Sequence, residues 1–206
     1  MQLSNKIYIW IIALACLVSF FSSFGSKLNL IEPIFFNKFL ISFNQIQFYD
    51  FKTTYLIGNE WWRLITPMFI HFSPTHLIFN SLWIYILGRE IEQLDGKIIF
   101  IFLILFASIS SNYLQYSFSG PSLFGGLSGV VYGLLGYCFV SETFLRINKF
   151  SFPPAIYIFM FVWLLIGFTG FLDLLGFGKI ANFAHLGGLL SGILSGYIFS
   201  MYNKKT

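Results

Sequence analysis

Residues Gly120 to Gly136 read GPSLFGGLSGVVYGLLG. The stretch begins as a loop rich in glycine and proline, residues that interrupt regular structure, and continues as an apolar segment. Ser128 lies at this change, in the first turn of a helix that we predict over residues 127–140. The rest of the chain has to explain why a hydroxyl and several glycines lie at the start of an apolar helix.

The composition is typical of a membrane protein. Of the 206 residues, 57% are hydrophobic and 10% are charged, whereas soluble chains carry roughly 25% charged residues. Aromatic residues make up 21%, which suits lipid-facing surface. No basic cluster suggests a nucleic-acid partner. Cys16 and Cys138 lie in apolar runs, which favours buried thiols over a disulfide or a metal site.

We predict an all-α integral membrane protein with a single domain, residues 1–206. Six transmembrane helices are predicted over residues 7–24, 74–88, 98–116, 127–140, 154–172 and 181–201. The second helix begins with Ser73 as its cap and Pro74 in its first turn. The first run could instead be the core of a signal peptide, but its 18 residues favour a retained helix.

The connections between the predicted helices differ in length and composition. The first, residues 28–65, is long and ends in Glu60-Trp61-Trp62-Arg63. Paired indoles beside an arginine are typical of the water–lipid interface, so we expect this loop to lie partly there. The later connections are a charged turn (89–97), the glycine loop, a polar link (142–149) and a short Gly-rich loop (173–179).

Six helices place both termini on one side of the membrane. That side holds seven of the twelve Lys and Arg residues, namely Lys6, Arg89, Lys97, Arg146, Lys149, Lys204 and Lys205. The positive-inside rule therefore predicts cytoplasmic termini.

The fourth helix is too short to cross the membrane alone. Its 14 residues give a length of about 21 Å, against a hydrocarbon core of about 30 Å. If it ends near Glu142 at the inner surface, it begins roughly 9 Å below the outer surface. Irregular backbone at that depth must be buried in protein or line a water-filled cavity. We therefore expect the glycine loop to border a wet pocket.

Three polar residues are predicted to meet at one depth. The second, fourth and sixth helices run in the same direction, and His76, Ser128 and His185 each lie in a first turn. Polar groups inside a membrane usually face a cavity or one another. Ser128 and His185 suit a nucleophile and its general base. The Ser128 backbone N–H has no intrahelical acceptor, so it could stabilise an oxyanion.

Neighbouring side chains could complete this site. His76 and Asn80 are four residues apart, share one helix face and could add donors. Tyr132, one turn after Ser128, could pack on the imidazole of His185. We expect Asn182 to cap the sixth helix.

Structural explanations compete with this functional one. A serine in a membrane helix usually bonds to its own backbone, and small residues usually serve helix packing. The packing set would be Gly129, Gly133 and Gly136 against Ala184, Gly188, Gly192 and Gly196. The two interpretations agree, because close approach of these helices brings His185 to Ser128. A metal site is disfavoured, since His71 and His76 do not share a helix face.

These motifs resemble the rhomboid family of intramembrane serine proteases, and the 120–137 stretch is most similar to its bacterial GlpG-type branch. The motifs are Trp62-Arg63, the stretch HFSPTHLIFN at 71–80, Glu92 after Gly88, Gly126-Leu127-Ser128-Gly129 and Ala184-His185-Leu186-Gly187-Gly188. Together they cover residues 61–192.

The resemblance implies a Ser128–His185 dyad that forms an acyl-enzyme without a third acid. It implies an oxyanion hole from the Ser128 N–H, His76 and Asn80, with Tyr132 and Gly126 in support and no cofactor. Its expected substrates are single-pass membrane proteins, cut at small residues near a helix-breaking sequence in a bacterial inner membrane.

The family also implies how substrates arrive. They would approach beside the fifth helix, under loop 173–179, past an aromatic group formed by Phe161, Trp163, Phe168 and Phe171 that need not act as a gate as it does in relatives. His71 and Glu92 would be structural, and we expect no soluble domain ahead of the first helix.

The sequence is also compatible with two other classes of function. A non-catalytic rhomboid-like protein would bind transmembrane helices without cutting them, although such relatives typically lack the serine or the histidine. A small transporter would be expected to show inverted repeats, and the sequence contains no internal repeat.

Overall fold

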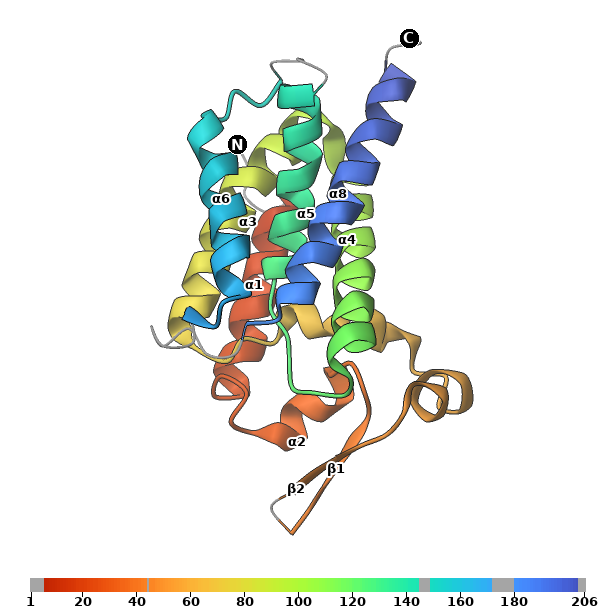
Figure 1. The fold of residues 1–206 in the computed structure, drawn as a ribbon. Coiled ribbons are helices and arrows are strands. Elements are labelled where there is room, and N and C mark those ends of the chain that lie inside the picture. Colours follow the sequence, from red (N-terminus) through yellow and green to blue (C-terminus); the bar gives the residue numbers. More distant parts are fainter. Residues whose placement is uncertain (1–5, 44, 145–148, 172–179, 204–206) are drawn as a thin grey trace.

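The structure, a computed structural model, describes residues 6–43, 45–144, 149–171 and 180–203. It is mostly helical (Figure 1). The longer helices are α1 (Ile7–Phe21), α3 (Pro74–Leu94), α4 (Gly96–Ser119), α5 (Ser128–Phe139), α6 (Pro154–Gly167) and α8 (Asn182–Asn203). The first loop contains α2 (Leu28–Ile31), the strands β1 (Phe39–Ser42) and β2 (Gln45–Phe48), and short turns at 32–34, 52–57, 61–64 and 66–69.

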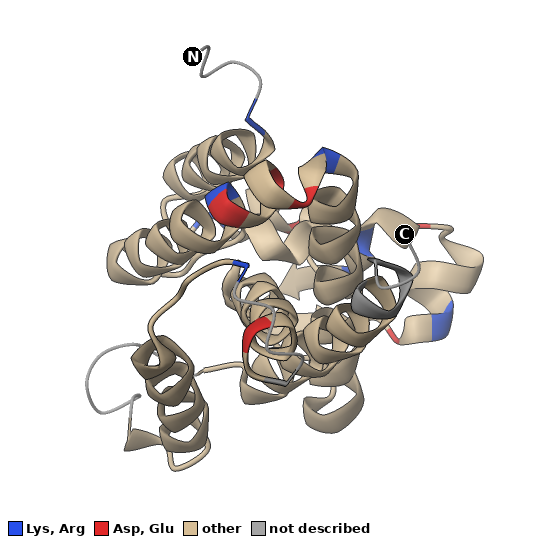
Figure 2. Ribbon diagram, turned by 90° about the horizontal axis from the view of Figure 1, so that it is seen from above, with Lys and Arg blue, Asp and Glu red and all other residues tan. Residues whose placement is uncertain are grey.

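The helices form an upright bundle in which α3, α5 and α8 begin at the same, lower end of Figure 1. The elements that carry Lys6, Arg89 and Lys97 meet at the opposite end, where α1 and α4 begin and α3 ends. Figure 2 looks down on that end and shows few charged positions on otherwise uncharged ribbons. Within the described residues, α4 alone is both long and apolar enough to cross a membrane by itself, and α1 and α6 are shorter apolar helices.

Several helix ends differ from the predicted ones. α1 ends at Phe21 because Ser23, Phe24 and Gly25 adopt positive φ and turn the chain. α3 continues to Leu94, through part of the expected charged turn. Gly88 does not stop it, because this glycine is a packing residue: a Cβ there would lie 2.9 Å from the Phe100 ring.

The ends of α4, α5 and α6 also differ from the predicted ones. α4 begins at Gly96 and ends before Gly120, both of which have positive φ. α5 has 12 residues, because residues 140–144 form a π-helical turn. α6 ends at Gly167, five residues earlier than predicted. Loop 173–179, Arg146, Lys204 and Lys205 lie outside the described residues.

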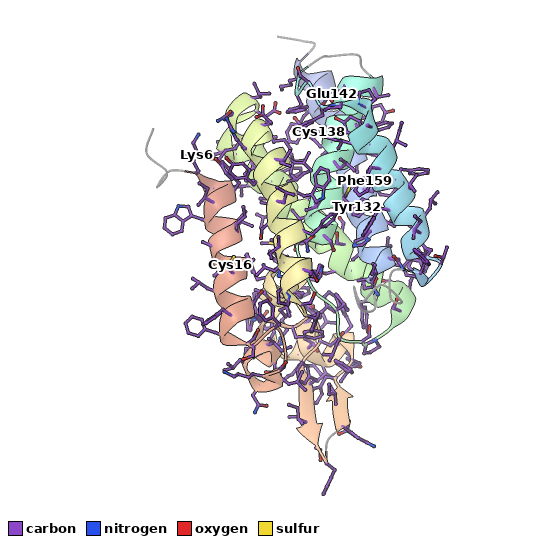
Figure 3. All side chains as sticks on the ribbon, turned by 90° about the vertical axis from the view of Figure 1, so that its left-hand side faces the viewer. Lys6, Cys16, Tyr132, Cys138, Glu142 and Phe159 are labelled. Atoms are coloured by element: carbon purple, nitrogen blue, oxygen red, sulfur yellow. The ribbon has the colours of Figure 1, made fainter. Side chains whose placement is uncertain are left out.

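Helix α5 is the central helix of the bundle. Ten of its twelve residues are buried, and it packs closely along α8. A Cβ on Gly188 would lie 1.9 Å from the carbonyl oxygen of Gly129, and a Cβ on Gly192 would lie 1.9 Å from that of Gly133. Only glycine permits such an approach, which small residues provide in membrane helix pairs. Figure 3 shows Tyr132 and Cys138 inside the bundle. Cys138 is buried as predicted, but Cys16 is exposed on α1.

The all-α prediction is wrong for the first loop, which contains a β-hairpin. Strands β1 and β2 form an antiparallel pair in which Phe39 is opposite Phe48. This hairpin and α2 lie below the bundle in Figure 1. Trp61 and Trp62 are 45% and 50% exposed, in keeping with half-wet indoles.

Arg63 is buried instead of lying at an interface with the tryptophans. It pairs with Glu60 and Glu32 and donates to the carbonyl of Phe35. Burial raises the pKa of Glu60, but hydrogen bonds and charge from Arg63 and Lys38 outweigh it, so that this pKa lies below its ordinary value. The arginine therefore holds separate parts of the first loop together.

Glu92 has a structural position at the far end of the bundle. Its carboxylate oxygens accept from the backbone N–H groups of Ile7 and Tyr8, each at 3.1 Å. These groups lie at the start of α1, where a helix has unpaired donors and a favourable dipole for an anion. Glu92 thus fixes the start of α1 against α3.

Candidate active site

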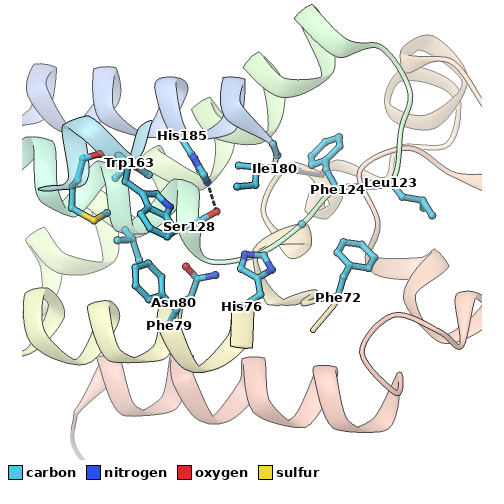
Figure 4. A pocket seen from close by; sticks show the side chains of 15 residues that line it. Phe72, His76, Phe79, Asn80, Leu123, Phe124, Ser128, Trp163, Ile180 and His185 are labelled. Carbon is cyan, nitrogen blue, oxygen red and sulfur yellow. Dashed lines mark hydrogen bonds between the residues drawn. The ribbon is translucent and has the colours of Figure 1, made fainter. Parts of the chain in front are cut away.

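Ser128 and His185 lie within hydrogen-bond distance. The Nε2 atom of His185 is 2.9 Å from the Oγ atom of Ser128 (Figure 4). Ser128 is the first residue of α5 and His185 is in the first turn of α8. The close glycine contacts between these helices allow the two short side-chain tips to meet. The distance is within the range of a nucleophile and its base.

The imidazole of His185 is held from one side by Tyr132. The two rings stack with centroids 4.7 Å apart and an interplanar angle of 28°. The Tyr132 hydroxyl donates to the carbonyl of Met160 in α6 at 3.0 Å, which fixes the tyrosine in turn. Among the described residues, no carboxylate forms a hydrogen bond with His185. The arrangement is a stacked dyad.

His76 and Asn80 face the dyad from α3. Ser73 caps this helix as predicted, accepting from the His76 backbone N–H at 3.2 Å. Figure 4 shows both side chains directed toward Ser128. The Nδ2 atom of Asn80 is buried and has no hydrogen-bond partner among the described residues. Buried donors are nearly always paired, so this amide is a donor available to a bound group.

A cavity of about 230 Å³ lies between these side chains. Its walls are mostly apolar and include Phe72, Phe79, Met160 and Trp163. The polar side chains of Ser128, His185, His76 and Asn80 also line it. Phe79 stacks on Trp163, with ring centroids 5.7 Å apart. Phe161, Phe168 and Phe171 are exposed instead. Such an apolar pocket with few convergent polar groups is typical of a ligand site.

The glycine loop lines the cavity with Leu123, Phe124 and Gly125, and it passes close to His76 where it has no side chain, at Gly126. Gly126 has φ +118°, and a Cβ on it would lie 2.6 Å from Cε1 of His76. Its N–H donates to the carbonyl of Pro67 at 3.0 Å. Gly126 thus supports the site by letting backbone pass beside His76.

Two local predictions were incomplete. The Asn182 side chain does not cap α8: its Oδ1 has no hydrogen-bond partner among the described residues, and its Nδ2 donates to the carbonyl of Gly167 in α6 at 2.8 Å. Gln115 of α4 accepts from the Ala184 N–H in the first turn of α8 at 3.1 Å. A polar residue in an apolar run was the available signal for Gln115. The resemblance implied only a structural role for His71, and its Nε2 accepts from the Leu127 N–H at 3.3 Å, next to Ser128.

No group of three His, Cys, Asp or Glu side chains suited to a metal ion occurs within the part of the chain that the structure describes. The polar groups of the cavity are instead one hydroxyl, two imidazoles and one amide. That set can transfer a proton and donate hydrogen bonds, as acyl transfer requires.

The Rhomboid domain family model matches residues 58–202. The chain is 36% identical over 149 residues to Rhomboid protease GlpG of Haemophilus influenzae, covering 72% of this chain and 74% of that protein. It is 39% identical over 136 residues to Rhomboid protease GlpG of Serratia proteamaculans, and 34% over 146 residues to that of Klebsiella pneumoniae. These matches cover 66% and 71% of this chain, and 47% and 51% of the respective relatives, or about half their length.

Proposed function

This chain belongs to the rhomboid family of intramembrane serine proteases, and we propose that it cleaves single-pass transmembrane proteins through a Ser128–His185 dyad. The observation that carries this proposal is the 2.9 Å contact between His185 Nε2 and Ser128 Oγ, beside a cavity that contains an unpaired amide donor.

The chemistry follows from the two side chains. His185 Nε2 takes the proton of the Ser128 hydroxyl as Oγ forms a bond to the scissile carbonyl carbon. The tetrahedral intermediate then breaks its C–N bond, and His185 gives the proton to the leaving nitrogen. A water molecule attacks the acyl-enzyme with His185 again as base, which releases the new carboxyl terminus and restores Ser128. Tyr132 keeps the imidazole in place throughout.

The oxyanion would be stabilised by donors from two helices. Ser128 begins α5, and its N–H has no hydrogen-bond acceptor among the described residues. The Asn80 amide and the His76 imidazole line the same cavity. Donors fixed before the reaction stabilise the developing charge without reorganisation, and each is worth roughly 10²–10³ in kcat.

The membrane arrangement is part of the proposal. We place α1, α3, α4, α5, α6 and α8 across a bacterial inner membrane with cytoplasmic termini. α5 begins inside the bundle, above the lower end of α4 in Figure 1, which supports a site below the outer surface. α6 separates the cavity from lipid, since Met160 and Trp163 line the cavity while Phe161 is 56% exposed. A transmembrane substrate would therefore approach past α6.

The test uses purified protein in lipid vesicles with a reporter that contains one transmembrane segment. Ser128→Ala should abolish cleavage, and a fluorophosphonate probe should label the wild type at Ser128. Labelling should disappear in His185→Ala, and Asn80→Ala should lower kcat by about 10²-fold. Cleavage that survives in Ser128→Ala would refute the dyad. A wild-type protein that binds the reporter yet leaves it uncut would instead indicate a non-catalytic member of the family.

A further inference from the structure

We infer that His71 is a positioning residue for the reaction, holding the Ser128 N–H in the oxyanion hole through the neighbouring peptide group. This inference rests on the proposed function. His71 lies between the short turn 66–69 and α3 and is fully buried. It touches neither the cavity nor the dyad, so any effect on the chemistry has to pass through another residue.

Both ring nitrogens of His71 have partners in different parts of the chain. Nε2 accepts from the Leu127 N–H at 3.3 Å. Nδ1 lies 3.3 Å from the carbonyl oxygen of Phe69 and 3.4 Å from the Ser19 hydroxyl of α1. A neutral imidazole has one donor and one acceptor nitrogen. Because Nε2 accepts, the proton is assigned to Nδ1, which donates to the Phe69 carbonyl.

The hydrogen bond from the Leu127 N–H to His71 also constrains the adjacent peptide group, which carries the Ser128 N–H. Leu127 has φ −72° and ψ −5°, a helical conformation, so its N–H and that of Ser128 both point out of the helix start. One of these two donors is occupied by His71, and the other stays free for an oxyanion. The helical geometry at Leu127 couples them, so that a rotation of the first peptide group moves the second.

The same imidazole also supports the other side of the oxyanion hole. The rings of His71 and His76 make an edge contact, with centroids 5.0 Å apart. The Gly126 N–H is held by the Pro67 carbonyl. The segment 67–71 therefore clamps the backbone of Gly126 and Leu127 and contacts His76. His71 joins the two groups of donors that the reaction needs at a fixed separation.

A matched pair of substitutions separates positioning from folding. Gln places a polar tip near the position of Nε2, where it can accept from Leu127, whereas Asn places one near Nδ1 and cannot reach. His71→Asn should lower kcat by about 10- to 100-fold, since misplacement by about 1 Å can cost that much, and should leave KM within about twofold. His71→Gln should recover at least about tenfold of the loss.

The measurements are kcat and KM for the vesicle-bound reporter, the rate of fluorophosphonate labelling at Ser128, and the melting temperature of each variant. Equal kcat for the Gln and Asn variants would overturn the inference, as would losses that follow the melting temperature alone. Neither result would argue against the Ser128–His185 dyad. The proposed function fails separately, if Ser128→Ala still cleaves.

A second measurement keeps His71 unchanged, so it does not depend on whether a His71 variant folds. The chain has three histidines, and the ¹⁵N spectrum of His71 can be assigned by subtracting the signals lost in His76→Ala and His185→Ala. The Nδ1–H form is expected for His71. A spectrum of the Nε2–H form would mean that Nε2 cannot accept from Leu127, and it would refute the positioning role.

Discussion

The α5–α8 interface and helix α6 are held in place by opposite means. Glycines bring the backbones of α5 and α8 together along their length, and both carry a member of the dyad. α6 carries an apolar outer face and is joined to its neighbours by three polar contacts: Tyr157 to Glu142 near one end, Met160 to Tyr132 at mid-length, and Gly167 to Asn182 at the other end. The comparison indicates a closely packed helix pair beside a helix that packs against it less closely.

The largest expected effect comes from separating α5 and α8. Gly188→Val would place its Cβ 1.9 Å from the Gly129 carbonyl oxygen, and overpacking of this kind costs about 3 kcal/mol or more. Cleavage and the unfolding transition should both be lost. The control is Ile158→Ala, since Ile158 lies on the outer face of α6 and is 64% exposed. This variant should retain both cleavage and the unfolding transition. If Gly188→Val is active, the interface is not rigid.

A smaller effect is expected where α5 meets α6 at Tyr132. Tyr132→Ala removes the ring that stacks on His185 and should lower kcat by about 10- to 100-fold through misorientation of the base. Tyr132→Phe keeps the ring and loses the bond to Met160, so we expect a change of about threefold or less. Similar kcat values for the two variants would show that the hydroxyl matters more than the stack.

In the first turn of α6, the Tyr157 hydroxyl donates to the carboxylate of Glu142. Tyr157→Phe should lower stability by about 1.5–3 kcal/mol, because a hydrogen bond to a charged group is lost. Denaturant titration of the vesicle-reconstituted protein measures this change. Labelling of Ser128 by the fluorophosphonate probe should stay within about twofold, since the dyad lies on other helices. A large loss of labelling would argue against independent parts.

The smallest change is expected at the last residue of α6, Gly167. Asn182→Ala removes one neutral hydrogen bond to the Gly167 carbonyl and should lower stability by about 1 kcal/mol. His185 lies one turn further along α8, within the glycine-packed part, and should keep its position. The melting temperature and the labelling rate of Ser128 test this together. A fall in labelling larger than that in Tyr157→Phe would reverse the order proposed for the two ends.

Local sequence patterns predicted the parts of the site that depend on helix direction. His76 follows the Ser73 cap and Ser128 follows the glycine loop, and parallel helices bring such helix starts together. The start of α8 before His185 was predicted to within one residue, although the expected Asn182 cap does not form. The Gly129 and Gly188 contact was predicted for the same reason, since small residues at helical spacing mark a close pair. Helix ends were less accurate, because Gly88 packs within α3 although a local pattern reads it as a stop.

Contacts between distant segments could not be predicted from local sequence patterns. Leu127 and His71 are 56 residues apart, and Ala184 and Gln115 are 69 apart. Nothing in the periodicity of either segment specifies its partner. The hairpin was missed although Gln45–Phe48 alternates polar and apolar residues, the pattern of a half-buried strand. The expectation of an interfacial loop gave Arg63 a surface position, whereas its five donors suit the carboxylates and carbonyls of a folded loop.

The bond from Glu92 to the start of α1 has a consequence for biogenesis. The amides of Ile7 and Tyr8 are synthesised before their acceptor, which follows 84 to 85 residues later. Until then the leading end of α1 has water or lipid headgroups as its partners. The order of synthesis therefore makes α1 a helix that inserts early and docks late, with a single carboxylate on α3 to close the assembled bundle.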